Sequence, residues 1–240
     1  MVGLFYLTRR RFVQVTIGGS GILGLRCISP EQTMVTLYTF GDSILDCGRY
    51  NEFGVHPGQL LVHNNDHLFP EFHAQDLESR GSARIEHRAR DGATVTGLQS
   101  QAKGLHVKGR AIALLTIGGN DLLRGLIHDT GEGMAAFASA LDEFVRQLPI
   151  RPVLLGNVYD PTCGDDRRNF LGVEPAVART NLQRINVAIE KIANRYGHLV
   201  DLHAHFLSGD SSWFTATIEP SLRGASEVRR AFLPYVLDKA

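Results

Sequence analysis

Short apolar runs alternate with longer helical patterns from Met34 to the end of the chain, and this alternation constrains the fold more than any other feature. The runs are rich in β-branched and aliphatic residues, as strands are, and the run at 111–117 is apolar throughout, as expected of a strand buried on both faces. Strands that alternate with helices form parallel sheets. The predicted strands are 34–40, 83–89, 111–117, 152–158 and 198–202. The sequence therefore predicts an α/β fold with a central parallel five-stranded sheet.

Helices are predicted between and after these strands, at 94–105, 133–148, 175–196 and 224–237. The helix at 175–196 has Pro175 in its first turn and Gly197 after its last, which are the favoured positions of these two residue types. Segment 51–74 differs, because it contains two prolines and two glycines and no sustained period. We expect it to form a loop excursion.

Composition excludes several classes of function. The chain has 240 residues, with 25 lysines and arginines against 25 aspartates and glutamates, so it carries no basic field for nucleic acid. Its cysteines, Cys27, Cys47 and Cys163, are too few and too scattered for a disulfide framework or a zinc site. No stretch is apolar for long enough to span a bilayer. We expect a single globular domain over residues 34–240, of unknown oligomeric state.

The segment 1–33 stands apart from this domain. Thr8-Arg9-Arg10-Arg11-Phe12, followed by a moderately apolar run, is similar to a twin-arginine export signal, but no A-x-A cleavage site follows. Alternatively, Met34 is the true start and the segment is an upstream extension. The first interpretation predicts an exported protein and the second a cytoplasmic one.

Small and polar residues follow the predicted strands at the edge of the sheet where open parallel sheets bind ligands. The Ser43 hydroxyl can act as a nucleophile, and the backbone N–H groups of Ser43 and Gly92 and the Asn120 amide can stabilise an oxyanion. Flanking residues predicted to contact the substrate are Asp42, Gly119, Asp121 and Tyr159. Each motif alone also fits a structural role, in which glycines form turns and Ser43 and Asn120 cap helices. Their shared position at one sheet edge favours an acyl-transfer site.

A cluster of His63, Asp66, His67 and His73 lies in the predicted loop excursion. Polar loops produce such clusters by chance, and no second set of ligands is evident. We expect neither a metal nor an organic cofactor.

Three motifs carry a resemblance to a known family. FGDSILD, RDGATV and TIGGND resemble, in order and spacing, the first three sequence blocks of the SGNH (GDSL) hydrolases. The resemblance covers about residues 34–240 and implies a flavodoxin-like three-layer α/β/α sandwich with esterase or lipase chemistry. By position, it implies that Ser43 is the nucleophile and that Gly92 and Asn120 are oxyanion-hole donors.

The fourth block departs from the family, which has Asp-x-x-His-Pro where this chain has Ala216-Thr217-Ile218-Glu219-Pro220. Glu219 therefore occupies the position of the histidine that activates the serine. His203 and His205 follow the fifth predicted strand, and a histidine is the better base near neutral pH. We expect His205 to be the base, ahead of His203, with Glu219 as its orienting partner or as a substitute base.

These residues predict a serine-dependent hydrolase of small acyl esters that forms an acyl-serine intermediate. An alternative is a binding protein of the same fold that has lost catalysis with its histidine and binds an acyl or glycan ligand. A third possibility, which depends on export, is an enzyme that removes acyl groups from cell-surface glycans.

Overall fold

A computed structural model describes residues 34–240, and its centre is a five-stranded parallel sheet of order β2-β1-β3-β4-β5. The predicted segment 1–33 lies outside the described residues. The strands are β1 (Val35–Gly41), β2 (Ala83–His87), β3 (Arg110–Thr116), β4 (Val153–Gly156) and β5 (His198–Val200). The predicted five-stranded parallel sheet is confirmed, with strand boundaries within two residues of those expected.

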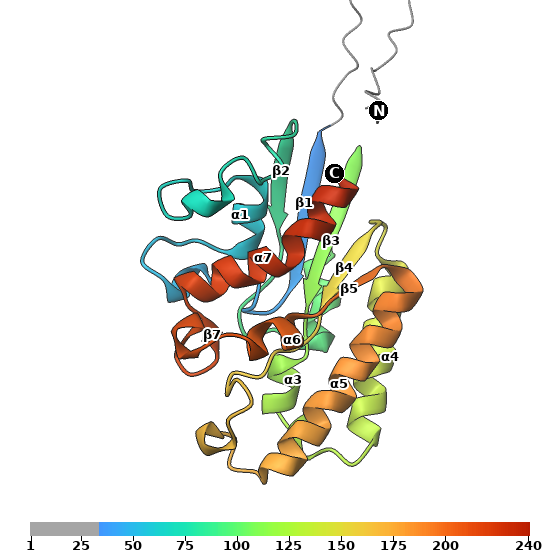
Figure 1. Ribbon diagram of the computed structural model, residues 1–240. Helices are drawn as coiled ribbons and strands as arrows, with labels where there is room; N and C mark the ends of the chain where they lie inside the picture. The colour runs from blue at the N-terminus through green and yellow to red at the C-terminus, as the bar shows by residue number, and fades with distance from the viewer. Residues whose placement is uncertain (1–33) are drawn as a thin grey trace, which may run out of the picture. The chain divides into compact units, whose positions relative to one another are not determined.

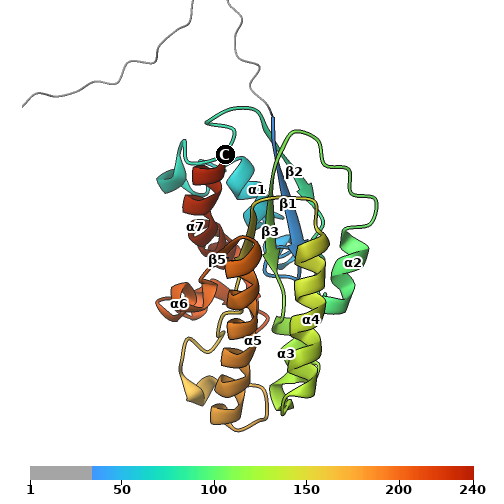
Figure 2. The ribbon, with the colours of Figure 1, turned by 90° about the vertical axis from the view of Figure 1, so that its right-hand side faces the viewer.

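Helices cover both faces of the sheet, which gives three layers (Figure 1). One face carries α1 (Pro57–Val62) and α7 (Leu222–Lys239), and the other carries α2 (Leu98–Gln101), α4 (Glu132–Gln147) and α5 (Pro175–Tyr196). Figure 2 shows α1 and α7 on one side of the strands and α2 and α4 on the other. The predicted α/β/α sandwich is confirmed.

The strands are buried on both faces because successive side chains point to opposite layers. Every residue of β1 is buried; Leu37 packs with the α1–α7 layer, and Tyr38 and Phe40 pack with the α4–α5 layer. The core is thus two apolar clusters separated by the sheet, one on each face.

Several short elements were not predicted. Segment 51–74 is not wholly a loop, because it contains α1, which begins at Pro57 after His56, whose ring accepts a hydrogen bond from the Gln59 N–H at 3.3 Å. The other unpredicted elements are α3 (Gly119–Leu123), α6 (Leu202–Leu207), and the antiparallel pair β6 (Phe214–Thr215) and β7 (Glu219–Pro220). Elements of two to six residues are too short to show a period in the sequence.

Helix α7 begins two residues before the predicted start, because Ser221 caps it by accepting a hydrogen bond from the Gly224 N–H at 3.1 Å. Single turns of 3-10 helix occur at Gly48–Tyr50, Pro70–Phe72, Val95–Gly97, Leu126–His128, Asp166–Arg168 and Ser211–Trp213. Within residues 34–240, no helix is both long enough and apolar enough to cross a membrane.

Candidate active site

Strand β1 ends in a tight corner that only glycine allows. Gly41 has φ +116°, and a Cβ atom there would lie 1.7 Å from the Thr116 carbonyl oxygen on the neighbouring strand β3. The Gln101 side chain makes two hydrogen bonds with the Gly41 backbone, an interaction that the sequence does not reveal. The corner fixes where the next two residues lie.

Ser43 lies in the turn that follows and is only 7% exposed. The Asp42 carbonyl accepts hydrogen bonds from the N–H groups of Leu45 and Asp46, at 3.2 and 3.1 Å, so the chain makes one turn here and no helix. Ser43 therefore caps no helix, which removes the structural role that the sequence allowed for it.

Glu219 lies beside Ser43. Burial raises the pKa of the Glu219 carboxyl. The Ser43 hydroxyl, within hydrogen-bonding reach, lowers this pKa, but the effect of burial is larger and the net shift is upward. Its Oε2 atom is buried and has no hydrogen-bond partner within residues 34–240. Ala216 and Thr217, between β6 and β7, both have positive φ, so a tight turn delivers Glu219 to this position.

His205 lies elsewhere. Its Nε2 atom is 3.0 Å from the Glu227 carboxylate on α7, and Arg230 also donates to that carboxylate. The backbone N–H of His203 donates to the Asn157 side chain at 2.8 Å. No contact in the described part of the chain joins either histidine to Ser43. We therefore keep His205 only as the alternative to Glu219 as the base, because β3 and β4 separate β1, which precedes Ser43, from β5, which precedes His205.

Asp42 is buried beneath the turn. Its Oδ1 atom accepts hydrogen bonds from the Thr116 hydroxyl at 2.9 Å and from the Ile44 N–H at 3.2 Å. Burial raises the pKa of the Asp42 carboxyl to about 7, against the opposing effect of these hydrogen bonds. The two hydrogen bonds of Oδ1 hold the Ser43 turn in place. Asp42 also borders an apolar pocket, so its contact with the substrate stays a prediction.

Helix α3 and the loop at 90–95 are joined by side-chain hydrogen bonds. The Asn120 amide donates to the Ala93 carbonyl at 3.1 Å, and the Asp121 carboxylate accepts from the Val95 N–H at 3.1 Å. Asn120 is the second residue of α3, which follows Gly118, so Asn120 does not cap the helix.

Gly92, in the loop at 90–95, has φ +76°, and its carbonyl accepts a hydrogen bond from Arg124 of the segment after α3. The hydrogen bonds between the loop and α3 therefore keep two predicted oxyanion donors, Gly92 and Asn120, close together.

Tyr159 follows β4 and stabilises the segment before Glu219. Its hydroxyl donates to the Ile218 carbonyl at 2.7 Å, and its ring stacks on Phe206 with centroids 4.5 Å apart. Burial raises the pKa of the Tyr159 phenol well above its usual value. The phenol is therefore a neutral hydrogen-bond donor.

A polar cluster on the Glu219 side of the site could not be identified from the sequence. The Asp91 carboxylate accepts from the Tyr50 hydroxyl at 2.7 Å and from Arg49 at 3.2 Å. Its negative charge contributes to the raised pKa of Glu219. The Asp91 N–H in turn donates to the Asp46 carboxylate at 2.9 Å, which joins the Ser43 turn to the loop that carries Gly92. Asp46 and Asp91 belong to the FGDSILD and RDGATV motifs, but no motif links them to Arg49 and Tyr50, so the cluster as a whole was not predictable.

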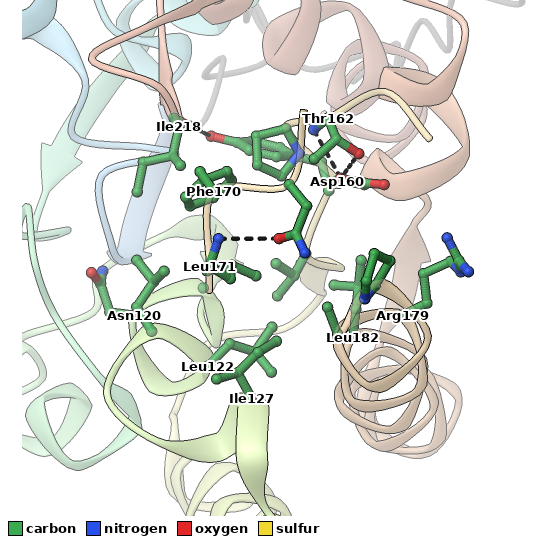
Figure 3. Close-up of a pocket in the computed structure, with 18 of the residues that line it drawn as sticks. Asn120, Leu122, Ile127, Asp160, Thr162, Phe170, Leu171, Arg179, Leu182 and Ile218 are labelled. Atoms are coloured by element: carbon green, nitrogen blue, oxygen red, sulfur yellow. Dashed lines mark hydrogen bonds between the residues drawn. The ribbon is translucent and has the colours of Figure 1, made fainter. Parts of the chain in front are cut away.

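An apolar pocket at the site has Ser43 and Asn120 among its lining residues. Figure 3 shows Asn120 and other residues of the wall. The pocket encloses about 880 Å³, its open mouth included, and its walls come from α3, the 159–174 loop and the start of α5. The apolar lining residues are Ile44, Leu122, Leu123, Ile127, Val158, Pro161, Phe170, Leu171, Pro175, Ala178, Leu182 and Ile218. Gly119, Asp42 and Tyr159, which were expected to contact the substrate, also line it.

Two histidines of segment 51–74 pair with different carboxylates. His63 contacts Glu78 at 2.8 Å, and His73 contacts Asp66 at 2.6 Å. Within residues 34–240, no group of three or more potential ligands could hold a metal ion.

Comparisons with known proteins show the family and the fold of the chain. Residues 39–225 match the model of the GDSL-like lipase/acylhydrolase family. No curated protein matches the chain significantly in sequence.

Three solved structures illustrate the similarity in fold. One is the acetylxylan esterase Axe2 from Geobacillus stearothermophilus, with a TM-score of 0.61 and 20% identity over 84% of this chain and 93% of that one. Another is LAE5, an alpha/beta hydrolase from the metagenome of Lake Arreo, with a TM-score of 0.59 and 25% identity over 85% and 96%. The third, from Veillonella parvula, belongs to the lipolytic G-D-S-L family, with a TM-score of 0.58 and 16% identity over 83% and 97%.

Proposed function

The chain belongs to the GDSL-like lipase/acylhydrolase family and is an ester-hydrolysing enzyme, and we propose that it cleaves carboxylic esters through an acyl intermediate on Ser43. The observation that carries the proposal is the position of Glu219, whose carboxyl lies beside the Ser43 hydroxyl and has a raised pKa. A serine hydroxyl is a poor nucleophile unless a neighbouring group takes its proton. Glu219 is placed to do so.

In the proposed first step, the Glu219 carboxylate takes the proton of the Ser43 hydroxyl while Oγ bonds to the ester carbonyl carbon. Negative charge then develops on the carbonyl oxygen, where the N–H groups of Ser43 and Gly92 and the Asn120 amide would donate to it. When the intermediate collapses, the bond to the alcohol oxygen breaks, and protonated Glu219 returns its proton to that oxygen. The products are an acyl-serine and a free alcohol.

In the second step, Glu219 takes a proton from a water molecule, which attacks the acyl carbon. Collapse of this intermediate releases the carboxylic acid and returns the proton to Ser43 Oγ. A carboxylate serves this cycle better when its pKa is raised, because general bases work best with pKa values near the working pH. Burial of Glu219 acts in that direction.

Labelling with a fluorophosphonate probe tests the proposal, because such probes bond covalently to activated serines. We expect wild type to be labelled and the Ser43→Ala variant to remain unlabelled, with matching losses of activity towards p-nitrophenyl esters. Ser79→Ala provides a control, since Ser79 lies in the loop before β2 and its hydroxyl is bonded to Asp76. If folded wild type is neither labelled nor active on any ester, we would favour the alternative, a binding protein that lost catalysis when glutamate replaced the family's histidine.

A further inference from the structure

We infer that the pocket between α3 and α5 holds the acyl chain of the substrate, and that the enzyme prefers esters of straight apolar acids longer than acetate. This inference rests on the proposed function. It begins with the walls of the pocket, which are apolar along most of their extent, with Asp42 and Asn120 as polar lining residues near Ser43. A pocket of this kind stabilises bound CH2 groups by removing them from water.

The position of the general base decides which half of the ester enters the pocket. The leaving alcohol must receive its proton from Glu219, so its oxygen lies on the Glu219 side of Ser43. That side carries the polar residues Tyr50 and Asp91. The wall of the pocket includes Asn120 and also Ile218, the residue before Glu219, but Glu219, Tyr50 and Asp91 themselves lie outside it. The acyl half therefore enters the pocket.

The extent of the pocket shows that it is larger than an acetyl group requires. Figure 3 shows Asn120 and Arg179 at opposite sides of the pocket, with Leu122, Ile127 and Leu171 between them. An acetyl methyl would reach only the part of the wall next to Ser43. At the other side Arg179 forms an ion pair with Asp166, so the apolar wall ends in charged groups. A chain of intermediate length would cover the apolar wall without desolvating this ion pair.

Activity on a series of p-nitrophenyl esters, from acetate through butyrate and hexanoate to octanoate, tests the inference. Burial of one CH2 group corresponds to about a fourfold change in kcat/KM, so we expect kcat/KM to rise by about that factor per CH2 until the wall is covered. A series in which acetate is the best substrate would overturn the inference and leave the proposed function standing.

A matched pair of variants on α5 links the preference to this pocket. Ala178 lines the pocket, whereas Ala176, two residues earlier, is exposed and does not. We expect Ala178→Phe to lower the ratio of kcat/KM for hexanoate to that for acetate at least tenfold, and Ala176→Phe to leave the ratio as in wild type. Equal ratios in all three folded proteins would overturn the assignment of the pocket.

Ligand binding separates failure of the inference from failure of the proposed function. Hexanamide resembles the acyl half but carries no charge, so it is not repelled by Glu219. We expect calorimetry to detect hexanamide binding to Ser43→Ala, with a negative heat-capacity change, and to detect none for acetamide. If no ester is hydrolysed, the proposed function fails. The pocket assignment is still supported if hexanamide binds to Ser43→Ala and no longer binds to the double variant Ser43→Ala, Ala178→Phe. Absence of hexanamide binding overturns the inference.

Discussion

The side-chain amide of Gln101 pairs with the backbone of Gly41 as a neighbouring strand would, accepting from the Gly41 N–H at 2.7 Å and donating to its carbonyl at 2.8 Å. Gly41 lies two residues before Ser43, at the end of β1, where strand pairing stops. Both partners are buried. A helix side chain thus completes the hydrogen bonding of the strand that carries the proposed nucleophile.

Replacement of Gln101 by methionine removes this pairing and keeps the length of the side chain. The Gly41 carbonyl retains a hydrogen bond from the Arg90 N–H, so the main cost is the unpaired buried N–H of Gly41. We expect Gln101→Met to lower the free energy of unfolding by about 1–3 kcal/mol in urea titrations. Gln99→Met, at an exposed position of the same helix, should change it by less than about 0.5 kcal/mol.

Substitution of Gly41 by alanine should be far more damaging. The new Cβ would overlap the Thr116 carbonyl, and φ +116° is unfavourable for alanine. We expect Gly41→Ala to be recovered unfolded, or with its melting temperature lowered by more than about 10 °C. Gly54→Ala is the control, because Gly54 also has positive φ but has open space around it. Similar melting temperatures for the two variants would contradict the close contact with β3.

Asn120→Asp separates the two roles open to Asn120. The substitution keeps the shape of the side chain but replaces its N–H donors with a carboxylate. If Asn120 donates to the oxyanion, the substitution should lower kcat by about 10²–10³-fold with little change in KM. A purely structural contact with the Ala93 carbonyl predicts lower stability and unchanged kcat. Stopped-time assays and thermal melts on Asn120→Asp and Asn120→Ala measure both quantities.

The pH dependence of kcat/KM identifies the base. Glu219 must be ionised to accept a proton, so kcat/KM should fall as the pH falls through the pKa of Glu219, which burial places above its ordinary value of 4.5. We expect Glu219→Gln to lose about 10²–10⁴-fold at all pH values. Glu219→His, which supplies the residue of the family motif, should keep more activity than Glu219→Gln and move the midpoint towards 6.5, the ordinary value for histidine.

His205→Ala is the control for this series. His205 is bonded to Glu227, away from Ser43, so its removal should leave the midpoint where it is in wild type. A lost or displaced midpoint in His205→Ala, with Glu219→Gln still active, would instead make His205 the base.

Stability should depend on pH through Asp42. Its pKa is raised to about 7 in the folded protein, so the folded state binds this proton more tightly than the unfolded chain does. The resulting stabilisation is fully present below about pH 4 and is lost as the pH rises through about 7. The difference from the ordinary value of 3.8 corresponds to about 4 kcal/mol.

The Asp42→Asn variant measures this contribution. Asparagine has the same shape, and its oxygen can accept the hydrogen bonds from Thr116 and Ile44. Relative to wild type, the variant should therefore gain stability as the pH rises from 4 to 8, by up to about 4 kcal/mol in urea titrations. A difference between the two proteins that does not vary with pH would show that Asp42 titrates normally.

The sheet was predictable because β3, which is buried on both faces, reads as an apolar run, and because β1 and the other strands are short apolar or β-branched runs that alternate with helical patterns. Ser43, Gly92 and Asn120 were predictable as a group because they follow strands at one edge. Glu219 was indicated as a partner of Ser43 only by the family's fourth block, and it ranked behind His205. It reaches Ser43 through the turn at Ala216 and Thr217, whose positive φ values no motif announces. The role of Gln101 was also hidden, because one amide on a short helix looks like any surface glutamine.

Ser43 and Glu219 lie near opposite ends of residues 34–240, and this separation sets the order in which the site is completed during synthesis. Ser43 emerges from the ribosome early, and all the residues of the apolar pocket except Ile218 precede residue 183. Glu219 comes after β5 and α6, so the proposed base joins Ser43 only when almost the whole domain has been made. A chain that is truncated before β7 would carry a nucleophile and most of an acyl pocket without the group that activates them.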